Sequence, residues 1–212
     1  MKRMTMAVLL LASMLGSVGL AENRTFQIDP VHSSIQFRIR HLYSTFVGRF
    51  NKFEGTISGD MANPATMKVS AKVEVTSIYT DNETREKHLR SPDFFDTDHH
   101  PVATFESIKV TPGEKNSTGS VTGKLTIRGV TKEVTFQGQF LGSGVGVGPD
   151  PKDRAGFHAV TTLNRFDYGV AFNGALPSGL PMLGSDVELI LDLEAVEVKP
   201  AAERAGAKAP AK

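Results

Sequence analysis

The densest group of side chains that could bind a metal ion lies between residues 88 and 100. It comprises His88, Asp96, Asp98, His99 and His100, and imidazole combined with carboxylate suits zinc or copper. Adjacent histidines on an extended segment point to opposite sides, so one ion does not readily bind both His99 and His100. The spacing therefore favours a polar loop, and we expect neither a metal site nor a cofactor here.

Five basic side chains occur where the surrounding pattern is apolar. His32 and His41 lie at the two ends of the first long strand, Arg85 and His88 lie three residues apart on one face of a short predicted helix, and Arg165 interrupts an apolar strand. A buried guanidinium without a partner is costly. Internal ion pairs or hydrogen bonds are therefore the simpler use for each of the five. The alternative is that they bind the polar head group of a ligand.

The motifs of common hydrolases are absent from the sequence. Neither Gly-x-Ser-x-Gly nor His-Glu-x-x-His occurs, and there is no cysteine to act as nucleophile, zinc ligand or disulfide partner. Alternate glycines at 142–148 resemble a phosphate-binding loop, but Pro149 and Pro151 follow, whereas such a loop needs a helix N-terminus. We therefore expect no catalytic residue and interpret this run as a flexible connection between strands.

Alternation with a period of two is the main structural signal, and it places successive side chains on opposite faces of a sheet. It recurs at residues 35–41, 53–57, 69–75, 121–127, 134–140, 156–164 and 186–198. A turn near Gly129 predicts a hairpin between two of these segments. Thr80, followed three residues later by Glu83, predicts a capped helix of about three turns that ends before Pro92.

About eight alternating strands in one domain leave two architectures, a two-sheet sandwich and a closed antiparallel barrel. Many inward positions are glycine or alanine, which favours an interior with room in it. A barrel of about eight strands can hold one small ligand. We therefore predict an all-β, antiparallel barrel with a short helix near residues 80–90.

The two ends of the chain differ from this domain in composition. Residues 1–21 begin with Lys2 and Arg3, continue with an apolar stretch and end with Gly19 and Ala21 at positions −3 and −1, as in a cleaved signal peptide. The apolar run is shorter than the roughly 20 residues that span a bilayer, so we expect export without stable membrane insertion. Residues 199–212 are rich in Ala, Lys and Pro and predict a disordered tail. The folded domain is then 22–198.

Charge and aromatic composition argue against nucleic-acid binding. Between the leader and the tail the chain carries 18 basic and 22 acidic side chains, so no basic surface field attracts phosphate backbones. The 13 phenylalanines, with no tryptophan, suit an apolar interior rather than a base-stacking platform.

Several short motifs occur in order along almost the whole of this domain. They are FQIDPVHS at 26–33, HL at 41–42, GRF at 48–50, REKHLRS at 85–91 with FFD at 94–96, PVATF at 101–105, GKLTIRGVTK at 123–132, AGF at 155–157 and LNRFDYG at 163–169. Together they resemble the YceI-like family. The resemblance implies a lipocalin-like antiparallel barrel, exported to the bacterial periplasm, that encloses a polyisoprenoid, an isoprenoid quinone or a fatty-acyl lipid. Family members resemble carriers or sequestering proteins rather than enzymes.

On this interpretation the inward faces of the strands line a tunnel for the lipid chain. The expected lining residues are Phe37, Ile39, Phe53, Ile57, Val69, Val73, Leu125, Ile127, Phe136, Phe140, Phe157, Leu189 and Leu191. His32, His41, Arg85, His88 and Arg165 are the candidates for binding the head group. Alternation fixes which residues share a face but not which face is the lumen.

Two departures and three alternatives bear on this expectation. Tyr43 stands where the family commonly has glycine, and Tyr168 where it often has phenylalanine, so either phenol could change which head group fits. The chain could instead be an enzyme acting on an isoprenoid or quinone-like substrate with His32 or His88 as general acid or base. It could also be an envelope-stress protein that recruits a partner through its tail. A homodimer is a further open alternative.

Overall fold

The computed structural model describes residues 23–114, 117–147 and 151–198. The expected signal peptide and the expected disordered tail lie outside the described residues. The described chain contains eleven strands, one α-helix and three short 3₁₀ helices. The strands are β1 (Asn23–Ile28), β2 (Ser34–His41), β3 (Ser44–Phe50), β4 (Phe53–Asp60), β5 (Lys68–Glu74), β6 (Ile78–Tyr79), β7 (Val102–Pro112), β8 (Thr118–Ile127), β9 (Val130–Val145), β10 (Asp153–Asn164) and β11 (Leu183–Glu197). The helices are α1 (Glu83–Arg90), η1 (Pro64–Thr66), η2 (Val75–Ser77) and η3 (Arg165–Tyr168).

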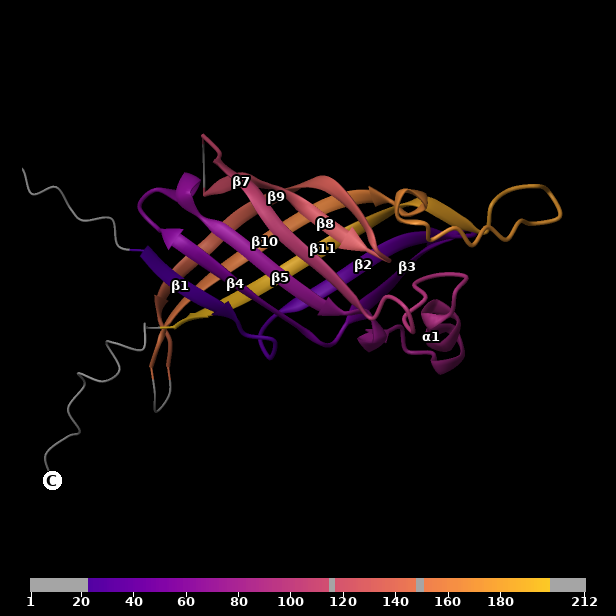
Figure 1. Ribbon diagram of the computed structural model, residues 1–212, viewed down its shortest axis with the longest axis horizontal. Coiled ribbons are helices and arrows are strands. Elements are labelled where there is room, and N and C mark those ends of the chain that lie inside the picture. Colours follow the sequence, from indigo (N-terminus) through magenta and orange to yellow (C-terminus); the bar gives the residue numbers. More distant parts are fainter. Residues whose placement is uncertain (1–22, 115–116, 148–150, 199–212) are drawn as a thin grey trace, which may run out of the picture.

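The eleven strands form one antiparallel sheet that closes on itself, because β1 pairs with both β4 and β11. Three pairs of consecutive strands act as single bent strands: β1 continues into β2, β3 into β4, and β5 into β6. The first bent strand pairs with the second along both of its parts, β1 with β4 and β2 with β3. The second pairs with the third in the same way, β4 with β5 and β3 with β6. Counted in this way, the barrel has eight strands in up-and-down order. The predicted antiparallel barrel of about eight strands is confirmed (Figure 1), and the two-sheet sandwich is excluded.

Alternation indicated seven of the eleven strands in the described chain but not β1, β3, β6 and β7. The hairpin at Gly129 is confirmed, with Ile127 paired to Val130 across the β8–β9 turn. In β3, Val47 is apolar yet faces outwards, with 47% of its surface exposed, so both faces carry apolar residues. In β7 the register shifts between Ser107 and Lys109. A bulge of this kind moves the apolar residues to the other face and breaks the period of two.

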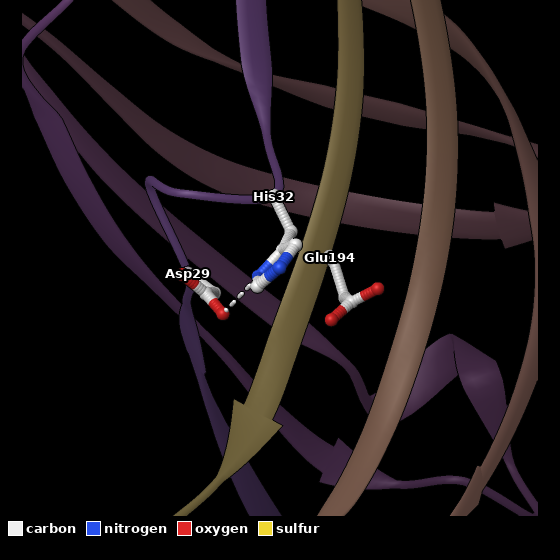
Figure 2. A group of neighbouring side chains, drawn as sticks. All are labelled: Asp29, His32 and Glu194. Carbon is white, nitrogen blue, oxygen red and sulfur yellow. Dashed lines mark hydrogen bonds and ion pairs between the residues drawn. The ribbon is translucent and has the colours of Figure 1, made fainter. Parts of the chain in front are cut away.

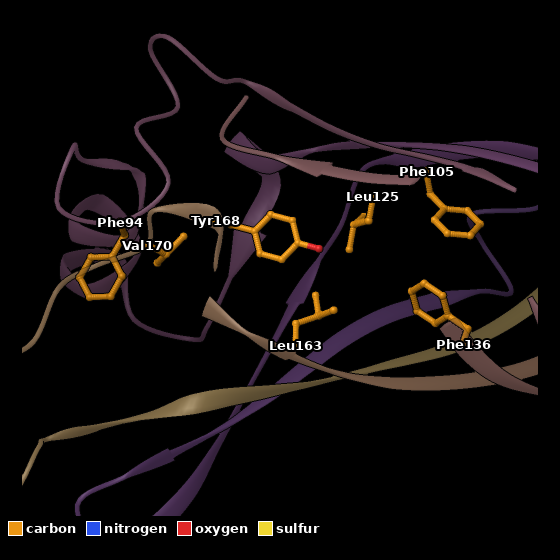
Figure 3. Packing of buried hydrophobic residues seen from close by; sticks show 7 residues of the cluster. All are labelled: Phe94, Phe105, Leu125, Phe136, Leu163, Tyr168 and Val170. Atoms are coloured by element: carbon orange, nitrogen blue, oxygen red, sulfur yellow. The ribbon is translucent and has the colours of Figure 1, made fainter. Parts of the chain in front are cut away.

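Buried side chains form two clusters inside the barrel. The first contains Phe26, Ile57, Ala155 and Ala195 and lies where β1 closes the barrel against β11. The second contains Phe94, Phe105, Leu125, Phe136, Leu163, Tyr168 and Val170 and extends along the barrel towards α1, as Figure 3 shows.

At two inward positions, glycine makes room for an aromatic ring of the protein itself and not for a ligand. A Cβ atom built on Gly123 would lie 2.4 Å from the Phe105 ring, and one on Gly48 would lie 2.2 Å from the Phe37 ring. The rings therefore rest directly on the glycine backbone. The expectation that inward glycine means empty space is wrong at these two sites.

Helix α1 begins later than predicted. Its N-cap is Asn82, whose side-chain oxygen accepts a hydrogen bond from the Arg85 backbone N–H at 2.9 Å; the predicted cap, Thr80, lies outside the helix. The helix has eight residues, about two turns instead of the predicted three, and ends at Arg90, before Pro92 as predicted. Asp81 has a φ of 62°, and this left-handed residue separates Thr80 from the first turn. No helix in the described part of the chain is long and apolar enough to cross a bilayer.

Candidate ligand-binding cavity

One end of the barrel is hollow. A cavity of about 580 Å³ lies between the barrel wall, α1, the β2–β3 hairpin and the segment 170–183. These elements meet at the same end of the molecule (Figure 1), while β1 begins and β11 finishes at the opposite end. The volume falls within the roughly 300–1,000 Å³ typical of pockets that enclose a small ligand.

Six of the thirteen residues predicted to line the tunnel line this cavity. They are Phe37, Ile39, Val73, Leu125, Ile127 and Leu189. All six come from strands that alternation identified. Their role in binding a ligand stays a prediction.

The other seven predicted lining residues lie outside the cavity. They are Phe53, Ile57, Val69, Phe136, Phe140, Phe157 and Leu191. Most of them pack against other core residues: the Phe136 ring meets Phe105 edge to face at 5.3 Å, and Phe140 meets Phe157 at 5.6 Å. The physical reason is that rings from neighbouring strands, and from strands one further apart, meet inside the barrel and fill it over much of its length. The hollow is therefore shorter than a tunnel along the whole barrel.

Sequence reasoning missed much of the lining, because it lies on segments without strand alternation. Leu89 of α1, Phe94 and Phe95 of the following turns, and Phe172 and Met182 of the segment after η3 all line the cavity. Phe94 and Phe172 stack with their ring centres 4.9 Å apart. The sequence signal that could have identified them is the concentration of phenylalanine at 94–95 and 166–172, outside any strand.

Four of the five candidate head-group residues line the cavity: His41, Arg85, His88 and Arg165. No aspartate or glutamate is among the described residues that line it. The cavity thus combines an apolar wall with basic groups and no acidic lining residue. This arrangement favours a ligand whose polar part is an acceptor or an anion.

His32 lies outside the cavity, in the turn between β1 and β2. Its Nδ1 contacts the Asp29 carboxylate at 2.8 Å, and this hydrogen bond is the main reason that the pKa of Asp29 is lowered. Asp29, His32 and Glu194 are close enough to resemble metal ligands (Figure 2). However, Arg154 pairs with both Asp29, at 3.1 Å, and Glu194. A guanidinium so close neutralises the carboxylates and makes this an ion-pair network.

The group first considered as metal ligands is dispersed among local contacts. His88 Nε2 contacts Asp93 at 2.9 Å, and His99 Nδ1 contacts Asp96 at 2.9 Å. The His100 ring lies over Gly129 of the β8–β9 turn. Within the described residues these side chains do not converge on one point.

Helix α1 is held by Arg85, which contacts β3 of the barrel, and by Glu86, which binds the segment between β6 and the helix. The Arg85 guanidinium lies 4.2 Å from the centre of the Phe46 ring and donates to the Thr80 carbonyl at 2.5 Å. Glu86 is buried, with 7% of its surface exposed. Its Oε1 accepts hydrogen bonds from the backbone N–H groups of Thr80, at 2.6 Å, and Asn82, at 3.4 Å. These bonds to the ionised carboxylate, that of Thr80 above all, lower the pKa of Glu86.

The Glu86 carboxylate should make the attachment of α1 sensitive to acid. Because its folded-state pKa lies below the ordinary value of 4.5, its stabilising effect is complete above pH 4.5 and is lost as the pH falls through the folded-state pKa. We expect Glu86→Gln to lower the melting temperature at neutral pH, by an amount that shrinks as the pH is lowered to 3. Circular dichroism melts at several pH values measure this difference.

Glu83→Gln is the matched control, since Glu83 is exposed on the first turn of the same helix. Its melting temperature should follow that of the unmodified protein at every pH. A Glu86→Gln deficit that stays constant between pH 7 and 3 would contradict the assignment of the carboxylate as the anchor.

Arg165 and Tyr168 carry the buried polar groups of the cavity wall. The sequence predicts that Arg165 interrupts a strand. In the structure it is instead the first residue of η3, directly after β10. Its Nε donates to the Gly184 carbonyl at 2.8 Å and its Nη1 to the Val170 carbonyl at 2.7 Å. Desolvation lowers the pKa of Arg165, and desolvation together with the nearby Asp167 raises the pKa of Tyr168 to about 12.

A closed eight-stranded barrel, packed at one end and hollow at the other, belongs to the class of lipocalin-like β-barrels. The family model for the YceI-like domain matches residues 26–195 of the chain. The chain belongs to the YceI-like family, as its motifs indicated.

Individual relatives agree with this assignment. The UPF0312 protein of Pseudomonas aeruginosa (strain LESB58) is 38% identical over 201 residues, which cover 92% of this chain and 99% of that protein. The crystal structure of the Campylobacter jejuni YCEI protein is similar at 31% identity and a TM-score of 0.64, covering 76% of this chain and 91% of that chain. A polyisoprenoid binding domain from Saccharophagus degradans shares the fold at 16% identity and a TM-score of 0.56, with coverage of 82% and 98%.

Proposed function

We propose that this protein binds the apolar chain of a lipid inside its barrel and acts as a carrier or store and not as an enzyme. The observation that carries the proposal is the apolar cavity of about 580 Å³ at the hollow end. Burial of about ten methylene groups contributes roughly 8 kcal/mol before the cost of association. The polar groups of the cavity wall then set the orientation of the ligand.

The ligand classes that fit are a polyisoprenoid, an isoprenoid quinone and a fatty-acyl lipid. The description of the Saccharophagus degradans neighbour as a polyisoprenoid binding domain supports the first of these. The concentration of phenylalanine rings around the cavity supports all three, because flat rings pack well against both branched and linear chains.

Native mass spectrometry of protein purified without detergent tests the proposal. We expect a mass above that of the polypeptide, and organic extraction should release a lipid that can be identified. The extracted protein should then take up added polyprenyl lipid. An unmodified mass together with no uptake of any added lipid would overturn the proposal.

We further propose that the protein is exported and works in the periplasm. The support is the leader pattern of residues 1–21, which combines basic residues, an apolar stretch and small residues at the cleavage positions. Cell fractionation and N-terminal sequencing of the protein produced with its full leader test this. A product that keeps Met1 and stays in the cytoplasm would contradict it.

A further inference from the structure

Two buried polar atoms in the cavity wall have no hydrogen-bond partner among the described residues: Nη2 of Arg165 and the hydroxyl of Tyr168. The two residues are 4% and 3% exposed, and both line the cavity. We propose that they form an interior anchor for the head group of the bound amphiphile, and that this head group is a carboxylate. This inference rests on the proposed lipid-binding function and specifies its ligand.

The backbone of η3 brings the two groups to one face. A 3₁₀ helix has three residues per turn, so that side chains three positions apart are eclipsed. Arg165 and Tyr168 are accordingly buried, whereas Phe166 and Asp167 between them are exposed. In Figure 3 the Tyr168 hydroxyl points into the barrel, between Leu125 and Leu163, and away from Phe94.

Both unpartnered groups are hydrogen-bond donors. A guanidinium has five N–H donors and no acceptor, and the Arg165 bonds to Gly184 and Val170 leave the two on Nη2 without a partner. The Tyr168 phenol remains protonated at neutral pH, because its pKa is raised to about 12. Buried donors of this kind are costly unless an acceptor reaches them. The complementary ligand atom is therefore an oxygen acceptor.

The charge of Arg165 selects a carboxylate over a neutral carbonyl. Among the described residues, its two hydrogen-bonding partners are uncharged carbonyl groups, and its guanidinium lies 4.1 Å from the centre of the Phe166 ring. The nearest carboxylate in sequence, Asp167, is on the exposed face of η3. A buried cation without a counter-ion is strongly unfavourable. A carboxylate ligand would supply the missing negative charge and up to four acceptor sites.

Three ligands of one chain length separate the contributions of charge, hydrogen bonding and apolar burial to binding: palmitate, methyl palmitate and hexadecane. Binding is measured by displacement of the neutral fluorescent probe N-phenyl-1-naphthylamine. We expect palmitate to bind about ten- to a hundredfold more tightly than methyl palmitate, as a charge-assisted pair requires. Hexadecane should be the weakest of the three. Equal affinities, or tighter binding of methyl palmitate, would overturn the carboxylate assignment.

Tyr168→Phe is the decisive variant, because it removes one hydroxyl and keeps the ring. We expect palmitate affinity to fall about three- to tenfold, with hexadecane and the fluorescent probe unaffected. The ligand-free variant should melt at a higher temperature than the unmodified protein, because an unsatisfied buried hydroxyl has been removed. Tyr43→Phe is the matched control, since Tyr43 is 90% exposed.

The outcomes distinguish this inference from the proposed function. A Tyr168→Phe variant that loses affinity equally for all three ligands would show that Tyr168 acts only in packing, and would overturn its assignment as a head-group anchor. An unmodified protein that binds neither the fluorescent probe nor any of the three ligands would instead overturn lipid binding itself. Arg165→Met should lower palmitate affinity further. It also leaves two carbonyls unpaired, so Tyr168→Phe remains the test if that variant does not fold.

Discussion

Ala103→Trp is expected to reduce lipid binding by at least about a hundredfold while the barrel still folds. Ala103 lies on β7, opposite Val73 of β5, and lines the cavity. An indole at this position occupies space that the lipid chain needs. Loss of about four buried methylene groups alone corresponds to roughly 3 kcal/mol, which is more than a hundredfold in affinity. Uptake of a polyprenyl lipid, measured by native mass spectrometry, gives the readout.

The neighbouring residue provides the control for this substitution. Thr104 is exposed on the outer face of the same strand, so Thr104→Trp adds the same side chain outside the barrel and should leave lipid uptake unchanged. Both variants should unfold cooperatively, since a hollow tolerates a larger side chain better than a packed core does. Normal uptake by a folded Ala103→Trp protein would show that the lipid binds elsewhere.

Periodicity predicted the faces of the strands but not how far the hollow extends along the barrel. Phe37 and Phe136 satisfy the same rule of alternation, yet Phe37 lines the cavity and Phe136 lies in the packed part. What separates them is where their ring neighbours lie: Phe136 packs on Phe105 in the filled part of the barrel, whereas the rings beside Phe37 themselves line the cavity. Such contacts join residues that are distant in sequence, and a pattern read along one strand does not contain them.

The polar part of the site was predicted by residue type rather than by position. Arg165 was identified as a cation in apolar surroundings, but its role depends on η3, which turns Arg165 and Tyr168 to one side. His32 looked equivalent in the sequence and lies instead in the Asp29 and Arg154 ion-pair network. A short 3₁₀ helix has no periodic signature of its own, so local sequence does not reveal which basic residues meet in the cavity.

Phe26→Ala is expected to lower the free energy of unfolding by about 3–5 kcal/mol, the range for removal of a buried phenylalanine. Phe26 is completely buried and packs in the cluster with Ile57, Ala155 and Ala195. It lies on β1, which pairs with β4 and β11 and so closes the barrel. The cavity left by the ring would therefore weaken the packing at β1, on which closure of the barrel depends. Urea unfolding should show a lower midpoint with an unchanged slope.

The matched substitution, Val31→Ala, lies in the turn between β1 and β2, where Val31 is 82% exposed, and should change stability by less than about 0.5 kcal/mol. Because the Phe26 cluster and the lipid cavity occupy different parts of the barrel, the folded Phe26→Ala protein should keep its lipid affinity. Stability and binding would then respond to different residues, with Phe26 affecting the first and Ala103 the second. A Phe26→Ala midpoint as close to normal as that of Val31→Ala would mean that closure of the barrel does not depend on this cluster.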